Sequence, residues 1–384
     1  SSDLKSIRSN SAYLISGQIL SRLMQVAYSV ALIRHYGALE YGIFQSAIHW
    51  YVALVPLTLL GFGPTLALRI GAGLPGSSTL IRKTLVIRFV FALLLCVCAV
   101  AFALLFPSGG GEKNVFLLIF APLLVLRALL NWTREVYTAH EDSRFHFRQI
   151  CISHFIQLVT GLYIMHFSHS LQAIGLSMIA VITLELVLSA GFIRKKYIFQ
   201  SKPETSVDFS GYMKQSLPIG FSQLAIRWML LGPVAAGQWI MKPSESFGAV
   251  TFVVMNLFFV CLLFDSVSRA WLTVAGRQPD HGSFSAMQSG ILKRMAGMSV
   301  VISFFSYMFG PHLMKITFGT ADYQILTMFG TGMSAVVPYA VSATFMQSLI
   351  VRSSARQILT ASASGLIVSM ALLLFLADRG MDIG

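Results

Sequence analysis

Long apolar segments recur along the whole chain, and each is long enough to cross a lipid bilayer. A spanning helix needs roughly 20 predominantly apolar residues, and only short polar loops separate these segments. Charged residues make up 11% of the 384 residues, against about 25% in soluble domains. The sequence therefore predicts an all-α polytopic membrane protein. We count eleven segments, at about 11–33, 43–68, 81–106, 115–138, 150–168, 172–193, 213–235, 247–271, 291–310, 324–350 and 357–377.

The basic residues are unevenly distributed between the two sides of the predicted bundle. The chain has 28 Lys and Arg and a net charge of +13, a balance that could also indicate a nucleic-acid partner. With a cytoplasmic N-terminus, 20 of the 28 fall on cytoplasmic loops and helix ends, and three lie at mid-membrane. The five on the opposite side are Arg34, Lys113, Lys242, Lys315 and Arg379. Because Lys and Arg concentrate in cytoplasmic loops, we expect a multi-pass protein of the cytoplasmic (inner) membrane, with its N-terminus inside and no nucleic-acid partner.

The two halves of the chain carry a weak internal repeat. NSAYLISGQILSRLM at 10–24 aligns with QSLPIGFSQLAIRWM at 215–229, and Arg22 coincides with Arg227. EYGIF at 40–44 matches SFGAV at 246–250 at nearly the same shift. Six predicted helices, an even number, separate the copies, so both halves enter the membrane in the same direction. This is a parallel repeat, related by an axis along the membrane normal.

The repeat predicts the domain organisation. We expect an N-terminal lobe of six transmembrane helices at 1–197, a cytoplasmic linker at 198–212 and a C-terminal lobe at 213–384. The second lobe shows only five segments, and MDIG at 381–384 aligns with QAIG at 172–175, where the sixth segment of the first half begins. We therefore expect one or more helices of the second lobe to be missing from this sequence.

Polar side chains inside the segments fall on single helical faces, and three arginines lie near mid-membrane. Arg22, Arg127 and Arg227 occupy positions where an arginine costs roughly 2.5–3.5 kcal/mol on insertion scales. Polar neighbours spaced three, four or seven residues apart share a face with them. If these polar helix faces point inward, they form a water-filled, basic cavity between the two lobes. The predicted cavity residues are Gln18, Arg22, Gln25, Arg127, Asn131, Arg134, Gln223 and Arg227.

Carboxylates are scarce inside the segments. Glu185 is the only one that we place near mid-membrane, either as a counter-ion for an arginine or as a coupling site for a proton or sodium ion. Asp265 precedes Arg269 by four residues, a spacing that predicts a local ion pair. Arg88 and Arg134 lie near cytoplasmic helix ends, where we expect arginines to snorkel to the interface, with a cavity role as the alternative.

No motif of a soluble enzyme is present. GGGEK at 109–113 lacks the spacing of a phosphate-binding loop, and no H-x-x-x-H or C-x-x-C pair suggests a metal site. We expect no metal, no cofactor and no catalytic residue. His49, beside Gln45, and His154 are expected to pack or to line the cavity, with a ligand role as the alternative.

Four motifs resemble the polysaccharide exporters of the MOP superfamily, the Wzx-type flippases of lipid-linked oligosaccharides. IRHYGALEYGIF is similar to the family's R-x-L-G-x-x-x-Y-G loop, and ITFGTADYQ to its F-G-x-x-Y turn. The family often has an Asp late in the seventh helix, where this chain reads MLLGPVAAG at 229–237. The motifs are Asn10 at the start of the first helix, IRHYGALEYGIF at 33–44, GFGPTLALRIGAG at 61–73 and ITFGTADYQ at 316–324.

The resemblance implies a V-shaped, MATE-like bundle of two six-helix lobes that alternates between inward-open and outward-open states. It implies a transporter that flips a polyprenyl-pyrophosphate-linked oligosaccharide, such as an O-antigen or capsule repeat unit, for lipopolysaccharide or other polysaccharide biosynthesis. Membrane lipids, a polysaccharide polymerase and chain-length proteins are the partners it implies. Cavity guanidiniums would replace the hydration of the pyrophosphate with bidentate hydrogen bonds.

Three other functions are open to a chain of this kind. A flippase of the peptidoglycan lipid precursor moves a similar pyrophosphate lipid. A MATE-type cation-coupled antiporter would favour carboxylates in its cavity, whereas here three mid-membrane arginines stand against one glutamate. A polymerase or glycosyltransferase would need a large outer loop or a soluble domain, and the predicted loops are short.

Overall fold

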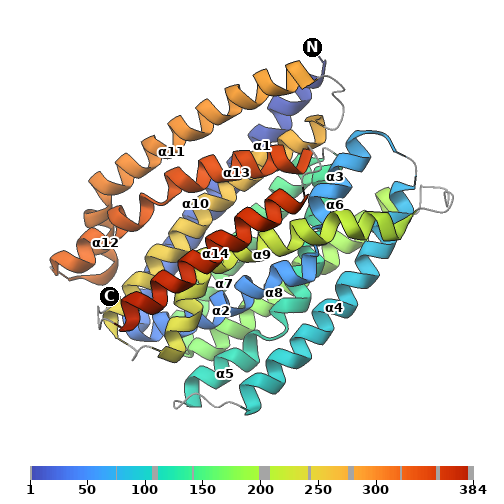
Figure 1. Ribbon diagram of the computed structural model, residues 1–384. Helices are drawn as coiled ribbons and strands as arrows, with labels where there is room; N and C mark the ends of the chain where they lie inside the picture. The colour runs from blue at the N-terminus through green and yellow to red at the C-terminus, as the bar shows by residue number, and fades with distance from the viewer. Residues whose placement is uncertain are drawn as a thin grey trace.

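The computed structural model describes a bundle of long helices (Figure 1), and within the described residues it contains no β-strand. The described residues are 2–74, 76–105, 111–140, 142–198, 208–240, 244–275, 281–320, 322–351 and 355–378. The helices of the first half are α1 (Ser2–Tyr36), α2 (Ala38–Leu59), α3 (Phe62–Gly71), α4 (Ser77–Leu105), α5 (Gly111–Phe120), α6 (Leu123–Ala139), α7 (Ser143–Phe167) and α8 (Leu171–Ile193), which a π-helical turn, Arg194–Ile198, extends. Those of the second half are α9 (Phe209–Ile240), α10 (Glu245–Ala275), α11 (His281–Phe318), α12 (Tyr323–Met333), α13 (Val336–Val351) and α14 (Ala355–Asp378).

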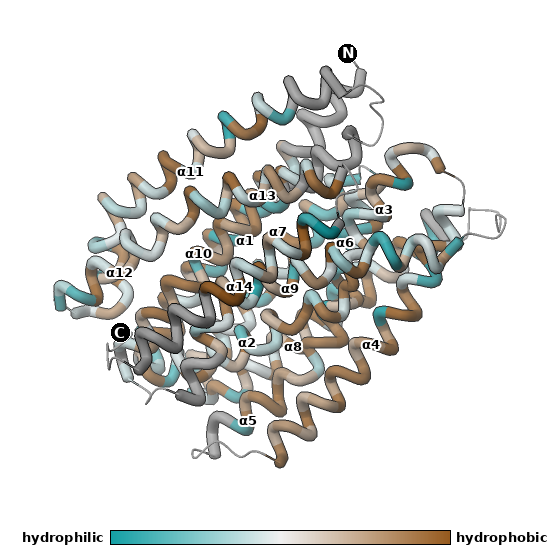
Figure 2. Tube along the Cα trace, viewed as in Figure 1, coloured by the Kyte–Doolittle hydropathy of each residue, from teal (hydrophilic) through white to brown (hydrophobic). Residues whose placement is uncertain are grey.

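The helices confirm the predicted all-α polytopic class. Eight helical segments of the described chain are long and apolar enough to cross a membrane. The first, seventh and eleventh predicted segments fold as α1, α9 and α14, which are helical but are not among those eight. Apolar residues dominate much of α4 and α8 (Figure 2), and α4 and α11 carry many of the exposed large apolar side chains. A lipid phase would cover these side chains.

Three of the predicted segments consist of two helices each. Between α2 and α3, Leu60 and Gly61 adopt left-handed conformations with φ of 51° and 70°. A Cβ at Gly61 would also lie 2.1 Å from the Ser216 carbonyl oxygen, so glycine is required there by both its φ and the close approach of α9. Between α5 and α6 the break occurs at Pro122, which has no N–H to continue the helical ladder. The broken segments are 43–68, 115–138 and 324–350.

The predicted linker is partly helical. The π-helical turn ends at Ile198 and α9 begins at Phe209, so residues 209–212 belong to α9. Tyr212 is buried, and its hydroxyl donates a hydrogen bond of 2.9 Å to the Phe62 carbonyl oxygen of α3. This contact fixes the start of the second half against the first. Residues 199–207 lie outside the described residues.

The two halves meet in a symmetric way. Helix α1 packs on α10 and α2 packs on α9, so the first two helices of one half contact the first two of the other in exchanged order. A twofold relation between the halves produces this exchange, because the repeat pairs α1 with α9 and α2 with α10. Gly42 and Gly248, equivalent in the repeat, lie together at the contact, and a Cβ on Gly42 would be 3.1 Å from the Gly248 Cα.

Candidate functional site

A cavity of about 220 Å³ lies between the two halves. Its walls come mainly from α1, α2, α3, α6 and α7 of the first half and from α10 of the second, with Arg227 added by α9. At one end it reaches Thr138 and His146, where α6 ends and α7 begins, which is the end of the bundle predicted to be cytoplasmic. At the other end it stops at Leu32 and Phe44, near the corner between α1 and α2. The cavity therefore runs from near the corner between α1 and α2 to the end of the bundle that we predict to face the cytoplasm.

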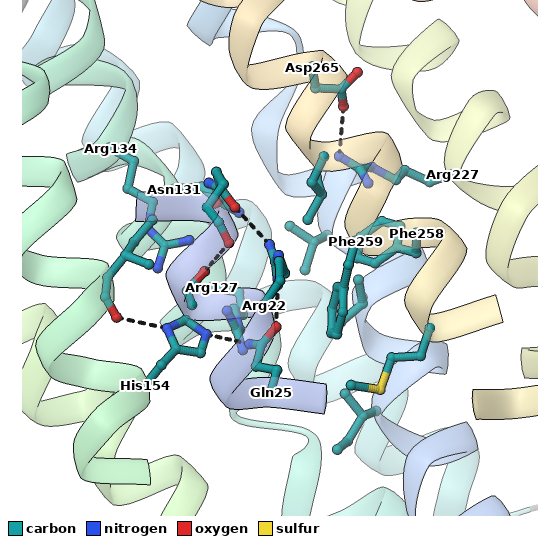
Figure 3. Close-up of a pocket in the computed structure, with 18 of the residues that line it drawn as sticks. Arg22, Gln25, Arg127, Asn131, Arg134, His154, Arg227, Phe258, Phe259 and Asp265 are labelled. Atoms are coloured by element: carbon teal, nitrogen blue, oxygen red, sulfur yellow. Dashed lines mark hydrogen bonds and ion pairs between the residues drawn. The ribbon is translucent and has the colours of Figure 1, made fainter. Parts of the chain in front are cut away.

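Arg22 lies in the cavity wall, held by neighbours on its own helix (Figure 3). Its guanidinium donates to the amide oxygen of Gln18 at 3.0 Å and to that of Gln25. These residues are four before and three after Arg22, so one face of α1 presents all three side chains. The guanidinium carbon lies 4.2 Å from the ring centroid of Phe259 on α10, a cation–π contact.

The Arg22 cluster continues into α7. The Gln25 amide nitrogen is hydrogen-bonded to Nε2 of His154, while Nδ1 of the same ring lies 2.8 Å from the Ile150 carbonyl oxygen. A neutral imidazole with its proton on Nδ1 satisfies both contacts. The sequence predicted Gln25 at the cavity and His154 either packed or on the cavity wall, and the structure joins both to Arg22 through one chain of hydrogen bonds.

Arg134 lines the cavity and forms an ion pair with Glu185. Its Nη2 lies 2.9 Å from Glu185 Oε1, and the Ser153 hydroxyl donates to Glu185 Oε2 at 2.6 Å. Glu185 is buried and is not part of the cavity wall. Of the two roles considered for Glu185, the structure places it in the geometry of a counter-ion for Arg134.

Arg227 and Asp265 form an ion pair in the second half. Arg227 Nη2 lies 3.3 Å from Asp265 Oδ2, and the Tyr339 hydroxyl donates to Asp265 Oδ1 at 2.9 Å. The Arg227 guanidinium also lies over the ring of Phe258, 4.6 Å from its centroid. The structure thus gives Asp265 a partner other than Arg269, whose side chain lies outside the described residues. The physical reason is that Asp265 is on the cavity-facing side of α10, which packs against α9.

Arg88 is not an interfacial anchor, and this prediction is wrong. The side chain is fully buried and forms an ion pair with Glu135 of α6, with its guanidinium 5.5 Å from the Phe62 ring centroid. Gly63 makes room for the pair, since a Cβ there would lie 2.3 Å from Glu135 Cδ. Glu135 and Asp265 both line the cavity, so Glu185 is not the only carboxylate near the arginines. Sequence reasoning missed Glu135, and its one signal was a carboxylate next to Arg134 in an apolar segment.

Two cavity arginines, Arg22 and Arg127, have no carboxylate within ion-pair distance among the described residues. Nε of Arg127 is buried and lacks a hydrogen-bond partner in the same part of the chain. Gln223, by contrast, is absent from the cavity wall, as is Glu185. The predicted residues that do line the cavity are Gln18, Arg22, Gln25, Arg127, Asn131, Arg134, Arg227 and Asp265.

Within the described residues, no group of three or more His, Cys, Asp or Glu side chains could hold a metal ion. The polar groups on the cavity wall are mainly guanidiniums, amides and imidazoles, and the two carboxylates there, Glu135 and Asp265, are paired with arginines. Such groups bind anions and hydrogen-bonding ligands.

Comparisons with known proteins place this arrangement in context. The family model described as "Polysaccharide biosynthesis protein" matches residues 7–235, more than half of the chain. Among solved structures, the MATE multidrug transporter DinF-BH is 14% identical, with a TM-score of 0.65, covering 95% of this chain and 85% of that one. The MATE transporter VcmN of Vibrio cholerae in the bent form is 16% identical, with a TM-score of 0.62 and coverages of 95% and 87%. No curated protein matches the chain.

Proposed function

The chain belongs to the polysaccharide biosynthesis protein family, and from this premise we propose that it flips a polyprenyl-pyrophosphate-linked oligosaccharide across the cytoplasmic membrane. Membership confirms the resemblance to the polysaccharide exporters of the MOP superfamily, and the fold is that of MATE transporters. In the proposed cycle, the two halves expose the central cavity first to the cytoplasm and then to the opposite side.

The observation that carries the proposal is the pair of unneutralised guanidiniums in the cavity. Arg22 and Arg127 have no carboxylate partner among the described residues, and both line the cavity. A pyrophosphate diester carries about two negative charges, which two guanidiniums can match with bidentate hydrogen bonds. Gln18, Gln25 and Phe259 hold Arg22 in place, so little side-chain freedom is lost when an anion binds.

The walls on either side of the arginines fit the other parts of such a substrate. Polar side chains, among them Gln18 and Asn131, line the path available to sugars. Leu59, Leu262 and Phe259 supply an apolar wall where α2 and α10 border the cavity. We propose that the polyprenyl tail stays in the bilayer, entering between the halves, while the head group occupies the cavity.

The charge of the cavity disfavours a cationic substrate. Four arginines face two carboxylates on its wall, and both carboxylates are already bound by arginines. A cationic drug would meet net positive charge in a site of low dielectric, where repulsion is strong. DinF-BH, which shares the fold, is described as a multidrug transporter, but at 14% identity it shows the fold alone.

Energy coupling is part of the proposal. Glu185 and Asp265 each hold an arginine by an ion pair, and we propose that both are counter-ions. A proton or sodium ion that drives transport would then bind elsewhere or compete with one of these ion pairs.

The proposal is tested by flipping of a fluorescent polyprenyl-pyrophosphate glycan in proteoliposomes. Arg22→Ala and Arg127→Ala should reduce the flipping rate about 10- to 100-fold each, because a charge-assisted hydrogen bond contributes about 1.5–3 kcal/mol. Arg356→Ala is the matched control, since Arg356 is exposed at the start of α14. Should both cavity variants fold and transport at the wild-type rate, the anion-binding role is wrong.

A further inference from the structure

His49 is a buried cavity residue whose imidazole ring makes no hydrogen bond with the described residues. Its side chain is 2% exposed and lines the cavity from α2. Neither Nδ1 nor Nε2 has a hydrogen-bond partner in the described part of the chain. A buried imidazole that has lost its hydrogen bonds to water and formed none with the protein costs about 1–3 kcal/mol, unless a ligand or a bound water replaces the lost bonds.

A second polar side chain stands one helical turn away. Gln45 precedes His49 by four residues, is 8% exposed and also lines the cavity. It makes no hydrogen bond with the described residues. The other cavity residues of α2 around this pair are apolar, among them Phe44, Ile48 and Val52. The two side chains are therefore an isolated polar patch in an apolar stretch of wall.

The patch lies at nearly the depth of the unpaired arginine on α1. Arg22 is 14 residues before the end of α1, and His49 is 11 residues after the start of α2, on either side of the corner at Gly37. At 1.5 Å per residue these positions are about 21 Å and about 17 Å from that corner. A ligand whose charged group contacts Arg22 would thus place the next part of its head group beside His49.

The hydrogen-bond donors and acceptors of His49 and Gln45 decide the class of ligand. A neutral imidazole offers one donor and one acceptor, and the Gln45 amide offers both as well. A phosphate supplies only acceptors to such groups, and a cation would be repelled by the nearby guanidiniums. A sugar hydroxyl both donates and accepts, so it satisfies either side chain completely.

We propose that His49 and Gln45 form a glycan subsite that binds hydroxyl groups of the sugar attached directly to the pyrophosphate. The inference rests on the proposed function, since it assigns the neighbouring arginines to the pyrophosphate. His49 is a specificity residue in this account, and it distinguishes a sugar-bearing lipid from a lipid that ends in pyrophosphate.

The test compares two kinds of probe on the purified full chain in detergent. One is undecaprenyl pyrophosphate, and the others are the same lipid carrying glucose, galactose or N-acetylglucosamine. Equilibrium affinities are measured by native mass spectrometry for wild type, His49→Leu, His49→Gln and Arg22→Gln. His312→Leu is the control, because His312 is exposed on α11. Thermal unfolding and size exclusion show that each variant is folded.

His49→Leu should weaken binding of at least one sugar-bearing lipid about 3- to 10-fold, the value of one or two neutral hydrogen bonds, and leave undecaprenyl pyrophosphate unaffected. His49→Gln, which keeps a donor and an acceptor, should restore most of the loss. Equal effects on all lipids would overturn the subsite, and no effect on any lipid would overturn it and indicate that water alone satisfies His49. A wild type that binds undecaprenyl pyrophosphate no better than Arg22→Gln would instead overturn the proposed function.

Discussion

The buried ion pair of Arg88 and Glu135 offers a quantitative test of how this bundle tolerates charge. The Arg88 side chain is 0% exposed and that of Glu135 is 9% exposed. Replacing Glu135 with methionine leaves a guanidinium in the interior without its carboxylate. Breaking a buried pair in this way costs about 3–5 kcal/mol, a factor of roughly 150 to 5,000 in the folding equilibrium. Arg88→Met should cost less, because Glu135 lines the cavity and its carboxylate can take up water there.

The double variant Arg88→Met/Glu135→Met should be within about 1 kcal/mol of wild type, since removing both charges also removes their desolvation penalty. Unfolding by SDS in mixed micelles, followed by circular dichroism, measures each free energy. Lys196→Met is the matched control, because its ion pair with Asp142 is 45% exposed on the lysine side and such pairs contribute about 0–1 kcal/mol. The reasoning would be refuted if the losses in the free energy of unfolding were additive in the double variant, or if Glu135→Met left that free energy unchanged.

Three further predictions follow from single contacts. Glu185→Gln should leave gradient-dependent transport in proteoliposomes unchanged, whereas loss of that dependence would make Glu185 the coupling site. Phe259→Leu removes the ring beneath Arg22 and should weaken binding of undecaprenyl pyrophosphate about 2- to 5-fold, the value of a cation–π contact; unchanged affinity would contradict a positioning role. Gly248→Ala should lower the thermal stability more than Gly191→Ala, because a Cβ at Gly248 would lie 2.1 Å from the Ala38 carbonyl oxygen and one at Gly191 has nothing within 4 Å; equal melting temperatures would contradict the close contact.

Hydropathy was enough to predict an all-α membrane fold. Within the described residues, each of the eleven apolar segments folds as one or two helices, and the alignment that pairs Gly42 with Gly248 identifies two residues that meet at the contact between the halves. The helix breaks were harder to predict. Leu60 has a left-handed φ that its residue type does not suggest, and the cause is tertiary, since α9 packs closely against the neighbouring Gly61.

The sequence predicted those parts of the cavity wall that consist of polar residues on one face of a single helix. The three-and-four spacing of α1 correctly placed Gln18, Arg22 and Gln25 on the wall. The same spacing predicted Gln223 on the wall, and the structure does not place it there. Spacing shows which residues share one face of a helix, but only the packing of the neighbouring helices decides where that face points. Ion pairs between helices could not be predicted for the same reason. A local rule predicted a pair of Asp265 with Arg269, whose side chain lies outside the described residues, and did not reveal the pair of Asp265 with Arg227 of α9.

The central claim is that unneutralised guanidiniums in the cavity bind the pyrophosphate, and affinity for undecaprenyl pyrophosphate tests it most directly. Arg22→Gln removes one net positive charge and should weaken binding about 10- to 100-fold. Arg22→Lys keeps the charge but not the planar fork, and should recover part of the loss. Arg134→Gln/Glu185→Gln removes a neutral pair, leaves the net charge of the site unchanged, and should stay within about 3-fold of wild type. Equal losses in Arg22→Gln and in the pair variant, or wild-type affinity in Arg22→Gln, would contradict the account.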